Sequence, residues 1–354
     1  MGLTKKIIYL SLGWFISIAT CLTVVEVSLR VIFDNDGWGK VKNINVLRNF
    51  KYNYKLNGLY PSSNEYVKYE RNEFGLRDNC EDPSNISILT IGGSTTDQRY
   101  VANESTWQYV LERYLTKEKD RKICVSNAGI DGHSTYGHIE AFKNWFPLIP
   151  GLQPKYVMLY VGINDANFQR PFEYNPGFDF NDNSDIKSLL KSLSIVRLLM
   201  PLIRYIRDGS ANEGPAYAGH KPKAYDQSEY SISTLNHETK YKSKLNADIF
   251  RDRLIIILKE ISKMNAEPIC ITQPHLLSIK KNGVDYGVPN IIGSNFSGLD
   301  HDHSIRELNK VIYDLCGDKV VDLYDQHYEA KYFYDGIHTT DIGSEYIGKK
   351  YLKL

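Results

Sequence analysis

The stretch ISILTIGGSTTD, residues 86–97, constrains the fold of this chain more than any other. Residues 86–91 form a short apolar run rich in β-branched side chains, which is typical of a buried strand. Gly92 and Gly93 follow the run and let the backbone turn where a side chain would clash. Ser94 comes next, at the carboxyl end of the expected strand, where ligands of open α/β sheets collect. The stretch therefore predicts either a turn that presents a nucleophile or an ordinary strand-to-helix connection.

Composition sets the class of protein. The chain has 354 residues, of which 42% are hydrophobic and 24% charged, as in folded globular proteins. Its net charge of +1 gives no electrostatic reason to expect a nucleic-acid partner. The five cysteines are odd in number and irregularly spaced, so we expect no disulfide framework and no metal site. Cys124 and Cys270 lie in apolar, strand-like runs and are predicted to be buried free thiols.

The N-terminus predicts a membrane anchor over residues 1–35. Residues 7–25 carry no charge, and at about 1.5 Å per residue they nearly span a hydrocarbon core of about 30 Å. A cleaved signal peptide is the alternative, but no A-x-A-like cleavage site follows. Lys5 and Lys6 precede the segment, while Asp34 and Asp36 follow it, so the N-terminus is expected in the cytoplasm and the rest outside.

Beyond the anchor, residues 36–85 are polar and are expected to form a lead-in that packs on the main domain, residues 86–354. In that domain apolar runs alternate with segments of helical periodicity, which predicts a parallel, doubly wound sheet. The expected strands cover residues 86–91, 122–125, 156–161, 268–272 and 320–323. The expected helices cover residues 104–119, 134–148, 247–264 and 304–315.

Residues 168–245 break this alternation and are expected to form an insertion. They include a basic amphipathic helix, predicted over 185–206, that either packs on the core or acts as a lid or membrane-facing helix.

Polar groups follow several of the expected strands. Ser94 follows the first, residues 127–132 the second and Asn164 the third, while Asp335 and His338 come from the loop after the last. Acyl transfer needs a nucleophile, a base, a carboxylate that orients the base, and donors for an oxyanion. This set supplies each of them.

These residues stand in four blocks: GGST at 92–95, NAGIDG at 127–132, GIND at 162–165 and DGIH at 335–338. In this order the blocks resemble those of the SGNH hydrolases, the GDSL-type lipase and esterase superfamily. The resemblance covers about residues 72–352, because NEFGLRD at 72–78 is similar to the lead-in of many anchored members. The first block departs from the family pattern, since it reads Gly-Gly-Ser rather than Gly-Asp-Ser.

The resemblance implies an α/β fold, a three-layer α/β/α sandwich with a mostly parallel, flavodoxin-like sheet, preceded here by one transmembrane helix. It implies that Ser94 is the nucleophile, His338 the general base and Asp335 the residue that orients the base. Ser94, Gly132 and Asn164 would form the oxyanion hole. No cofactor or metal is implied.

The function expected from these observations is a membrane-anchored serine esterase outside the cytoplasm, in the periplasm or at the cell surface. Its substrate is expected to be a small-molecule or glycan ester, most specifically an O-acyl or O-acetyl group on cell-surface carbohydrate. The alternatives are a polysaccharide O-acetyltransferase, a lipase or thioesterase, and a non-catalytic glycan-assembly scaffold.

Several other polar residues admit two interpretations. His301 and His303 could bind a metal, but solvated or helix-capping histidines are commoner. Asp165 is expected to brace the turn that holds Asn164. The residues that could line a substrate pocket are Asp97, Arg99, His133, His138 and His275.

Overall fold

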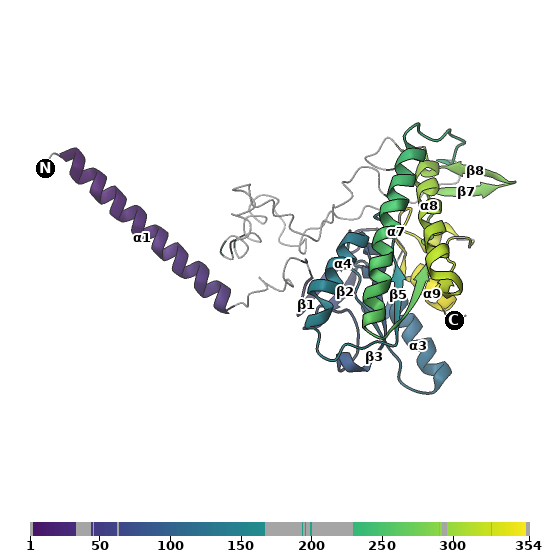
Figure 1. The fold of residues 1–354 in the computed structure, drawn as a ribbon, viewed down its shortest axis with the longest axis horizontal. Coiled ribbons are helices and arrows are strands. Elements are labelled where there is room, and N and C mark those ends of the chain that lie inside the picture. The colour runs from purple at the N-terminus through teal and green to yellow at the C-terminus, as the bar shows by residue number, and fades with distance from the viewer. Residues whose placement is uncertain are drawn as a thin grey trace.

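The computed structural model describes residues 3–32, 44, 46–61, 64–166, 193, 195, 199, 229–289, 291, 296–326 and 328–351. The folded domain has three layers, with a central parallel sheet between two layers of helices (Figure 1). The predicted α/β fold is therefore confirmed. Most of the predicted insertion at 168–245, including nearly all of the helix expected over 185–206, lies outside the described residues.

Among the described residues, the central sheet has five parallel strands in the order β4-β3-β5-β6-β9. Numbered along the sheet's own chain order this is 2-1-3-4-5, the flavodoxin-like arrangement. The strands are β3 (Ile86–Gly92), β4 (Cys124–Asn127), β5 (Tyr156–Tyr160), β6 (Glu267–Ile271) and β9 (Val320–Val321). Because β4 and β5 lie on opposite sides of β3, the connection from β3 to β4 and the connection from β5 to β6 run toward opposite edges of the sheet. A crevice for ligands is expected at the carboxyl ends of those two strands.

Successive residues of the strands face opposite helix layers, as the period of a strand requires. On one face, Leu89 and Ile91 join the apolar cluster that holds helices α4, α7 and α8. On the other face, Ile88 and Tyr160 pack with Trp107 in the cluster that holds α3 and α9. The helices are α3 (Trp107–Lys119), α4 (Thr135–Asn144), α7 (Thr239–Lys263), α8 (Gly298–Cys316) and α9 (Asp341–Lys350). Short 3-10 helices lie at Pro83–Asn85, Asn103–Ser105, Phe146–Leu148, Gly317–Lys319 and Ala330–Tyr332.

Two helices begin earlier than the apolar periodicity predicts. The first turns of α7 bury the polar side chains of Thr239 and Ser243, which a hydrophobic pattern does not detect. Helix α8 begins after Ser297, whose hydroxyl caps the backbone N–H of Asp300 while the Asp300 carboxylate accepts from the Ser297 N–H. This capping box was visible in the sequence as Ser-x-x-Asp before an apolar run.

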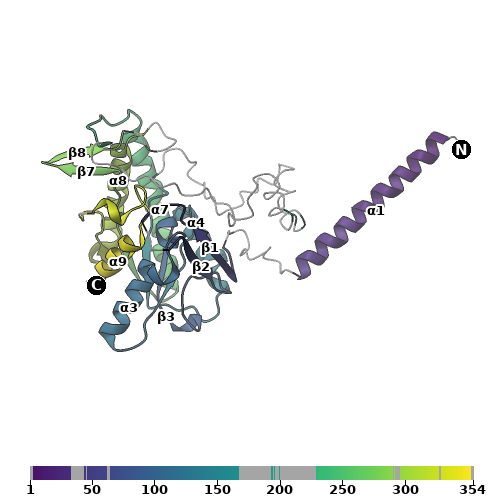
Figure 2. The ribbon, with the colours of Figure 1, turned by 180° about the vertical axis from the view of Figure 1, so that it is seen from behind.

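The lead-in contains a β-hairpin that periodicity did not predict. Strands β1 (Phe50–Lys55) and β2 (Tyr66–Arg71) pair antiparallel. Their buried side chains form an aromatic cluster that includes Tyr54, Tyr69 and, from the far end of the chain, Tyr334. A second hairpin of β7 (Ser278–Lys281) and β8 (Val284–Gly287) lies on the opposite side of the domain (Figures 1 and 2).

Helix α1 (Leu3–Ile32) contains a stretch, Tyr9–Leu29, that is long and apolar enough to cross a membrane, with a mean hydropathy of 1.8. None of that stretch is buried inside the protein. By length and composition, α1 fits the predicted anchor.

The prediction of free thiols at Cys124 and Cys270 is wrong, and so is the expectation of no disulfide framework. Cys80 is disulfide-bonded to Cys124, and Cys270 to Cys316, which leaves Cys21 free and exposed in α1. The partners are 44 and 46 residues apart in sequence and are brought within 5.8 and 6.2 Å, Cα to Cα, by the fold. Cys124 and Cys270 are buried in strands as expected, but each faces a second cysteine from a segment whose position the sequence pattern does not reveal.

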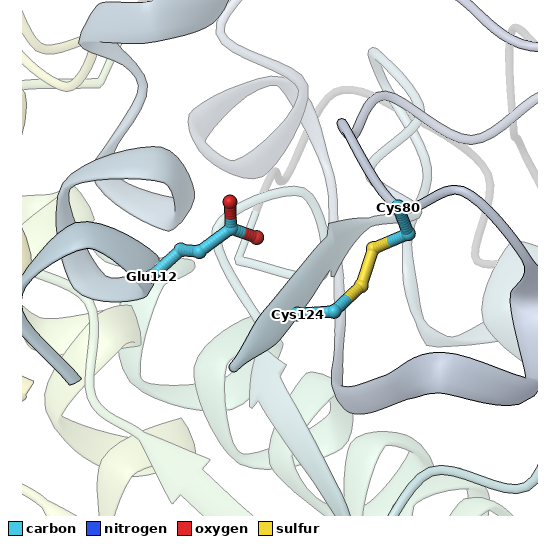
Figure 3. A group of neighbouring side chains, drawn as sticks. All are labelled: Cys80, Glu112 and Cys124. Carbon is cyan, nitrogen blue, oxygen red and sulfur yellow. A yellow bond between two sulfur atoms is a disulfide. The ribbon is translucent and has the colours of Figure 1, made fainter. Parts of the chain in front are cut away.

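Cys80, Cys124 and Glu112 form a group with the residue types of a metal site. Figure 3 shows that the two sulfurs are bonded to each other, with the Glu112 carboxylate reaching across from α3. Glu112 accepts a hydrogen bond from the Val125 backbone N–H at 2.8 Å. Metal binding requires free thiolates, so the disulfide accounts for this group.

We predict that the double substitution Cys270→Ser/Cys316→Ser lowers the free energy of unfolding by about 2–5 kcal/mol, because it releases a long loop in the unfolded chain. The measurement is guanidinium chloride denaturation of the full chain in detergent under oxidising conditions. Cys21→Ser is the matched control and leaves the midpoint unchanged. An unchanged midpoint in the double variant would contradict the prediction.

Candidate active site

The carboxyl end of β3 leads directly into a four-residue helix, α2 (Ser94–Asp97), that begins at Ser94. A Cβ on Gly92 would collide with the carbonyl oxygen of Tyr160, and a Cβ on Gly93 would lie 2.5 Å from Nδ2 of Asn164. Gly92 therefore permits the close approach of the β5 backbone, whereas Gly93 lies against the end of the Asn164 side chain. Because Gly93 is the residue before Ser94, the same contact puts the Asn164 amide beside the Ser94 turn.

Ser94, His338 and Asp335 form one hydrogen-bonded chain. Nε2 of His338 lies 2.7 Å from the Ser94 hydroxyl oxygen, and Nδ1 lies 2.7 Å from Oδ2 of Asp335. The other carboxylate oxygen of Asp335 accepts the backbone N–H groups of Ile337 and His338 at 2.9 and 2.7 Å. The carboxylate is thus fixed by the turn that carries the imidazole, and it holds the proton of the neutral ring on Nδ1, leaving Nε2 to accept from Ser94.

Two opposing effects set the pKa of His338. Burial lowers it, but the charge and hydrogen bond of Asp335 raise it more, so the net shift is upward from the ordinary value. Burial likewise raises the pKa of Asp335, and the interaction with His338 reverses this, so the Asp335 carboxyl is ionised at neutral pH.

The loop after β4 lies against the Ser94 turn. The Ile130 N–H donates to the carbonyl of Gly92 at 3.0 Å, and Gly129 packs so closely on the backbone of Asp97 that a Cβ would collide with it. Gly132, in the same loop, has a φ of +77°, a conformation that favours glycine. The residues predicted from the first three blocks therefore meet at one edge of the sheet.

Asn164 is oriented by one hydrogen bond, since its Nδ2 donates to the carbonyl of His133 at 2.9 Å. An amide nitrogen carries two hydrogens, so a second one remains to be donated. Asp165, the next residue, accepts from the backbone N–H of Thr135 at 3.1 Å, at the start of α4. Burial raises the pKa of Asp165 to about 6. These contacts agree with a bracing role for Asp165 in the turn that holds Asn164.

A buried charge network lies beneath the Ser94 turn, and periodicity did not reveal it. Asp97 is not a surface group: its Oδ1 accepts from Arg71 Nη2 at 2.6 Å and from the Tyr69 hydroxyl at 2.7 Å. Burial raises the pKa of Asp97, but the charges of Arg71, Arg99 and Arg77 together outweigh this effect, so the net shift is downward and the carboxyl is ionised. Arg77 donates to the carbonyl of Gln98 at 2.8 Å. Arg71 is the last residue of β2 and Arg77 follows it in the lead-in, and their sequence context does not indicate that these charged side chains are buried.

The other residues predicted to line a substrate pocket differ in their burial and in their interaction partners. His133 and His138 are buried behind the Asn164 side of the site, and burial lowers the pKa of His138 to about 3, so its imidazole is neutral. Arg99 pairs with Asp131 at 3.1 Å, in the loop that carries Gly132.

His275 and Asp302 form a second buried histidine–carboxylate pair, with Nε2 of His275 3.1 Å from Oδ1 of Asp302. Asp302 also accepts the Tyr324 hydroxyl at 2.6 Å and pairs with Arg306 at 2.7 Å. The expectation of solvated or helix-capping side chains concerned His301 and His303, which are both half-buried in the first turns of α8, and burial lowers the pKa of His301 to about 3. Asp302, between them, ties α8 to the loops after β6 and β9.

No protein-family model matches this sequence, and no curated protein matches it. Solved structures do resemble it. An acetyl xylan esterase shares 16% identity over 76% of this chain and 98% of its own, with a TM-score of 0.39. A lipolytic protein of the G-D-S-L family from Veillonella parvula shares 15% identity over 75% and 96%, with a TM-score of 0.41. An acetylxylan esterase from Geobacillus stearothermophilus shares 13% identity over 75% and 92%, with a TM-score of 0.40.

Similarity at this level is compatible with many activities, so the functional assignment rests on the geometry of the site. In that geometry, the four sequence blocks meet at one edge of the sheet.

Proposed function

We propose that this protein is a serine esterase anchored in a membrane by its N-terminal helix, with Ser94 as the nucleophile. The observation that carries the proposal is the hydrogen-bonded chain from Ser94 through His338 to Asp335, with both links at 2.7 Å. A hydroxyl, an imidazole and an ionised carboxylate in this order are the groups that acyl transfer requires. Asn164 and Gly132, on neighbouring loops, are proposed to complete an oxyanion hole with the Ser94 N–H.

The reaction proceeds in two halves. His338 takes the proton of Ser94 as the hydroxyl attacks the ester carbonyl, and Asp335 stabilises the imidazolium that forms. The negative oxygen of the tetrahedral intermediate accepts hydrogen bonds from the Ser94 and Gly132 N–H groups and the Asn164 amide. When the ester bond breaks, His338 gives its proton to the leaving alcohol. Water then attacks the acyl-enzyme with His338 again as base, and Ser94 regains its proton as the acid departs.

Two features favour an active site outside the cytoplasm. Lys5 and Lys6 lie in α1 ahead of its apolar stretch, and Asp34 and Asp36 follow the helix, which predicts a cytoplasmic N-terminus. The two disulfides are of the kind that persists in oxidising compartments such as the periplasm or the cell exterior.

An enzyme held on the outer side of a membrane meets esters of surface polymers, and we propose O-acyl groups, chiefly O-acetyl groups, on cell-surface carbohydrate as its substrates. Hydrolysis and acyl transfer to a sugar hydroxyl use the same three residues and differ only in whether water or a hydroxyl resolves the acyl-enzyme.

In the first test, the full chain in detergent is incubated with acetylated glycans and with short- and long-chain acyl esters. We expect acetate release without acyl transfer, and loss of about 10⁴-fold or more of the rate in Ser94→Ala, because triad members act as a unit. Circular dichroism checks that this variant is folded, and Ser87→Ala on the same strand is the matched control. Full turnover by folded Ser94→Ala would remove Ser94 as the nucleophile.

The second test is pH dependence. His338 must be neutral to accept a proton, and its pKa is raised, so kcat/KM is expected to increase with pH through a value above the ordinary pKa of about 6.5. Asp335→Asn removes the charge that raises this pKa. The variant should shift the acid limb to lower pH and lower kcat about 10⁴-fold, because the wrong tautomer is favoured. An acid limb that does not move would contradict the proposed pairing.

The third test concerns the oxyanion. Asn164→Ala removes one donor and is expected to lower kcat about 10²- to 10³-fold while KM for a small acetyl ester changes little. Steady-state kinetics at saturating ester measures the two constants separately. Asn79→Ala, in the lead-in, is a control in which both constants stay at the wild-type values. A rise in KM alone would instead make Asn164 a substrate-binding residue.

A further inference from the structure

We propose that Tyr60 and Tyr334 are positioning residues, through which the lead-in hairpin holds His338 in register with Ser94. The inference rests on the proposed function and extends it to a part of the chain that carries none of the four sequence blocks.

Tyr334 lies directly behind the imidazole. Its ring is parallel to that of His338, with an interplanar angle of 8° and ring centroids 5.6 Å apart, which is an offset stack. Its backbone N–H donates to the carbonyl of His338 at 3.0 Å, so ring and backbone act on the same residue. Only 4% of Tyr334 is exposed. A shift of this ring would therefore carry the imidazole with it or leave a void behind it.

Tyr334 is in turn held by the lead-in. The ring of Tyr60 stacks on it at 5.9 Å and 16°, and Tyr100 meets it edge-on at 6.4 Å. The hydroxyl of Tyr60 donates to the carbonyl of Tyr100 at 2.7 Å, and this holds the outer end of the Tyr60 ring in position. Tyr54, on β1, packs edge-on against Tyr100 at 5.4 Å. The rings of Tyr60, Tyr334 and His338 thus form one continuous stack.

The same hairpin also reaches the nucleophile. Arg71 and Tyr69, on β2, both hydrogen-bond to Asp97, the last residue of the short helix that begins with Ser94. The two partners of the 2.7 Å Ser94–His338 hydrogen bond come from positions 244 residues apart, and one hairpin supports both.

This support bears on rate because proton transfer between a hydroxyl and an imidazole is sensitive to position. Misplacement of a reacting group by about 1 Å can cost about 10²-fold in rate. Tyr334 stacks on the His338 ring and Tyr60 stacks on Tyr334, so both act through His338 as positioning residues.

The test compares Tyr60→Leu with Tyr60→Phe, which keeps the ring, in the full chain in detergent. The readouts are the rate constant for labelling of Ser94 by a small fluorophosphonate, kcat and KM for a short acetyl ester, and the low-field NMR signal of the His338 Nδ1 proton. We expect Tyr60→Leu to lower the labelling rate and kcat at least tenfold with KM within twofold, and to broaden or shift the proton signal. Tyr60→Phe should remain within threefold of wild type.

The control is Tyr66→Leu, because Tyr66 is on the same hairpin but 51% exposed, and it should change none of the readouts. If Tyr60→Leu does not fold, Tyr60→Met replaces it, since Met fills much of the same space without a ring. Folded Tyr60→Leu with wild-type labelling and an unchanged proton signal overturns the inference. If the fluorophosphonate does not label wild-type Ser94 but Tyr60→Leu still shifts the His338 proton signal, the positioning role is supported and the proposed esterase function is refuted.

Discussion

The guanidinium of Arg71 binds together segments that are distant in sequence. It pairs with Asp97 below the Ser94 turn and donates to the carbonyls of Gly75 and Gly129, the latter in the loop after β4. Removing one partner of a buried ion pair costs about 3–5 kcal/mol, because the remaining charge stays buried without compensation. Since the hairpin, the Ser94 turn and the loop after β4 all meet at this one side chain, the geometry of the site depends on the lead-in as much as on the sheet.

The sheet supplies the second constraint. Five parallel strands deliver their following residues to one edge, and the order β4-β3-β5 puts the loops after β3, β4 and β5 next to each other there. The glycines at 92 and 93 then allow β5 and Asn164 to approach within contact distance. The candidate active site therefore forms where the residues that follow three neighbouring strands come into contact at this edge.

Prediction from sequence succeeded where one local signal decides the outcome and failed where partners are remote. The strand at 86–91 and the turn at Ser94 follow from β-branched residues and two glycines. By contrast, polar residues that are buried, such as Thr239 on α7 or Asn127 on β4, made the element bounds inaccurate. The hairpin of β1 and β2 was missed because its aromatic residues find their partners in Tyr100 and Tyr334. The cysteines were misassigned for the same reason, because sequence spacing does not reveal which segments the fold brings together.

By itself, the sequence determined the class of fold, the apolar N-terminal helix and the identity of the residues at the strand ends, since each depends on local periodicity or on a short motif. Only the tertiary structure decided that His338 lies within hydrogen-bond distance of Ser94, that Asp97 is a buried partner of Arg71, and that four cysteines are paired. These contacts join positions tens to hundreds of residues apart. Their energies depend on burial and on exact neighbours, and both arise only when the whole chain has packed.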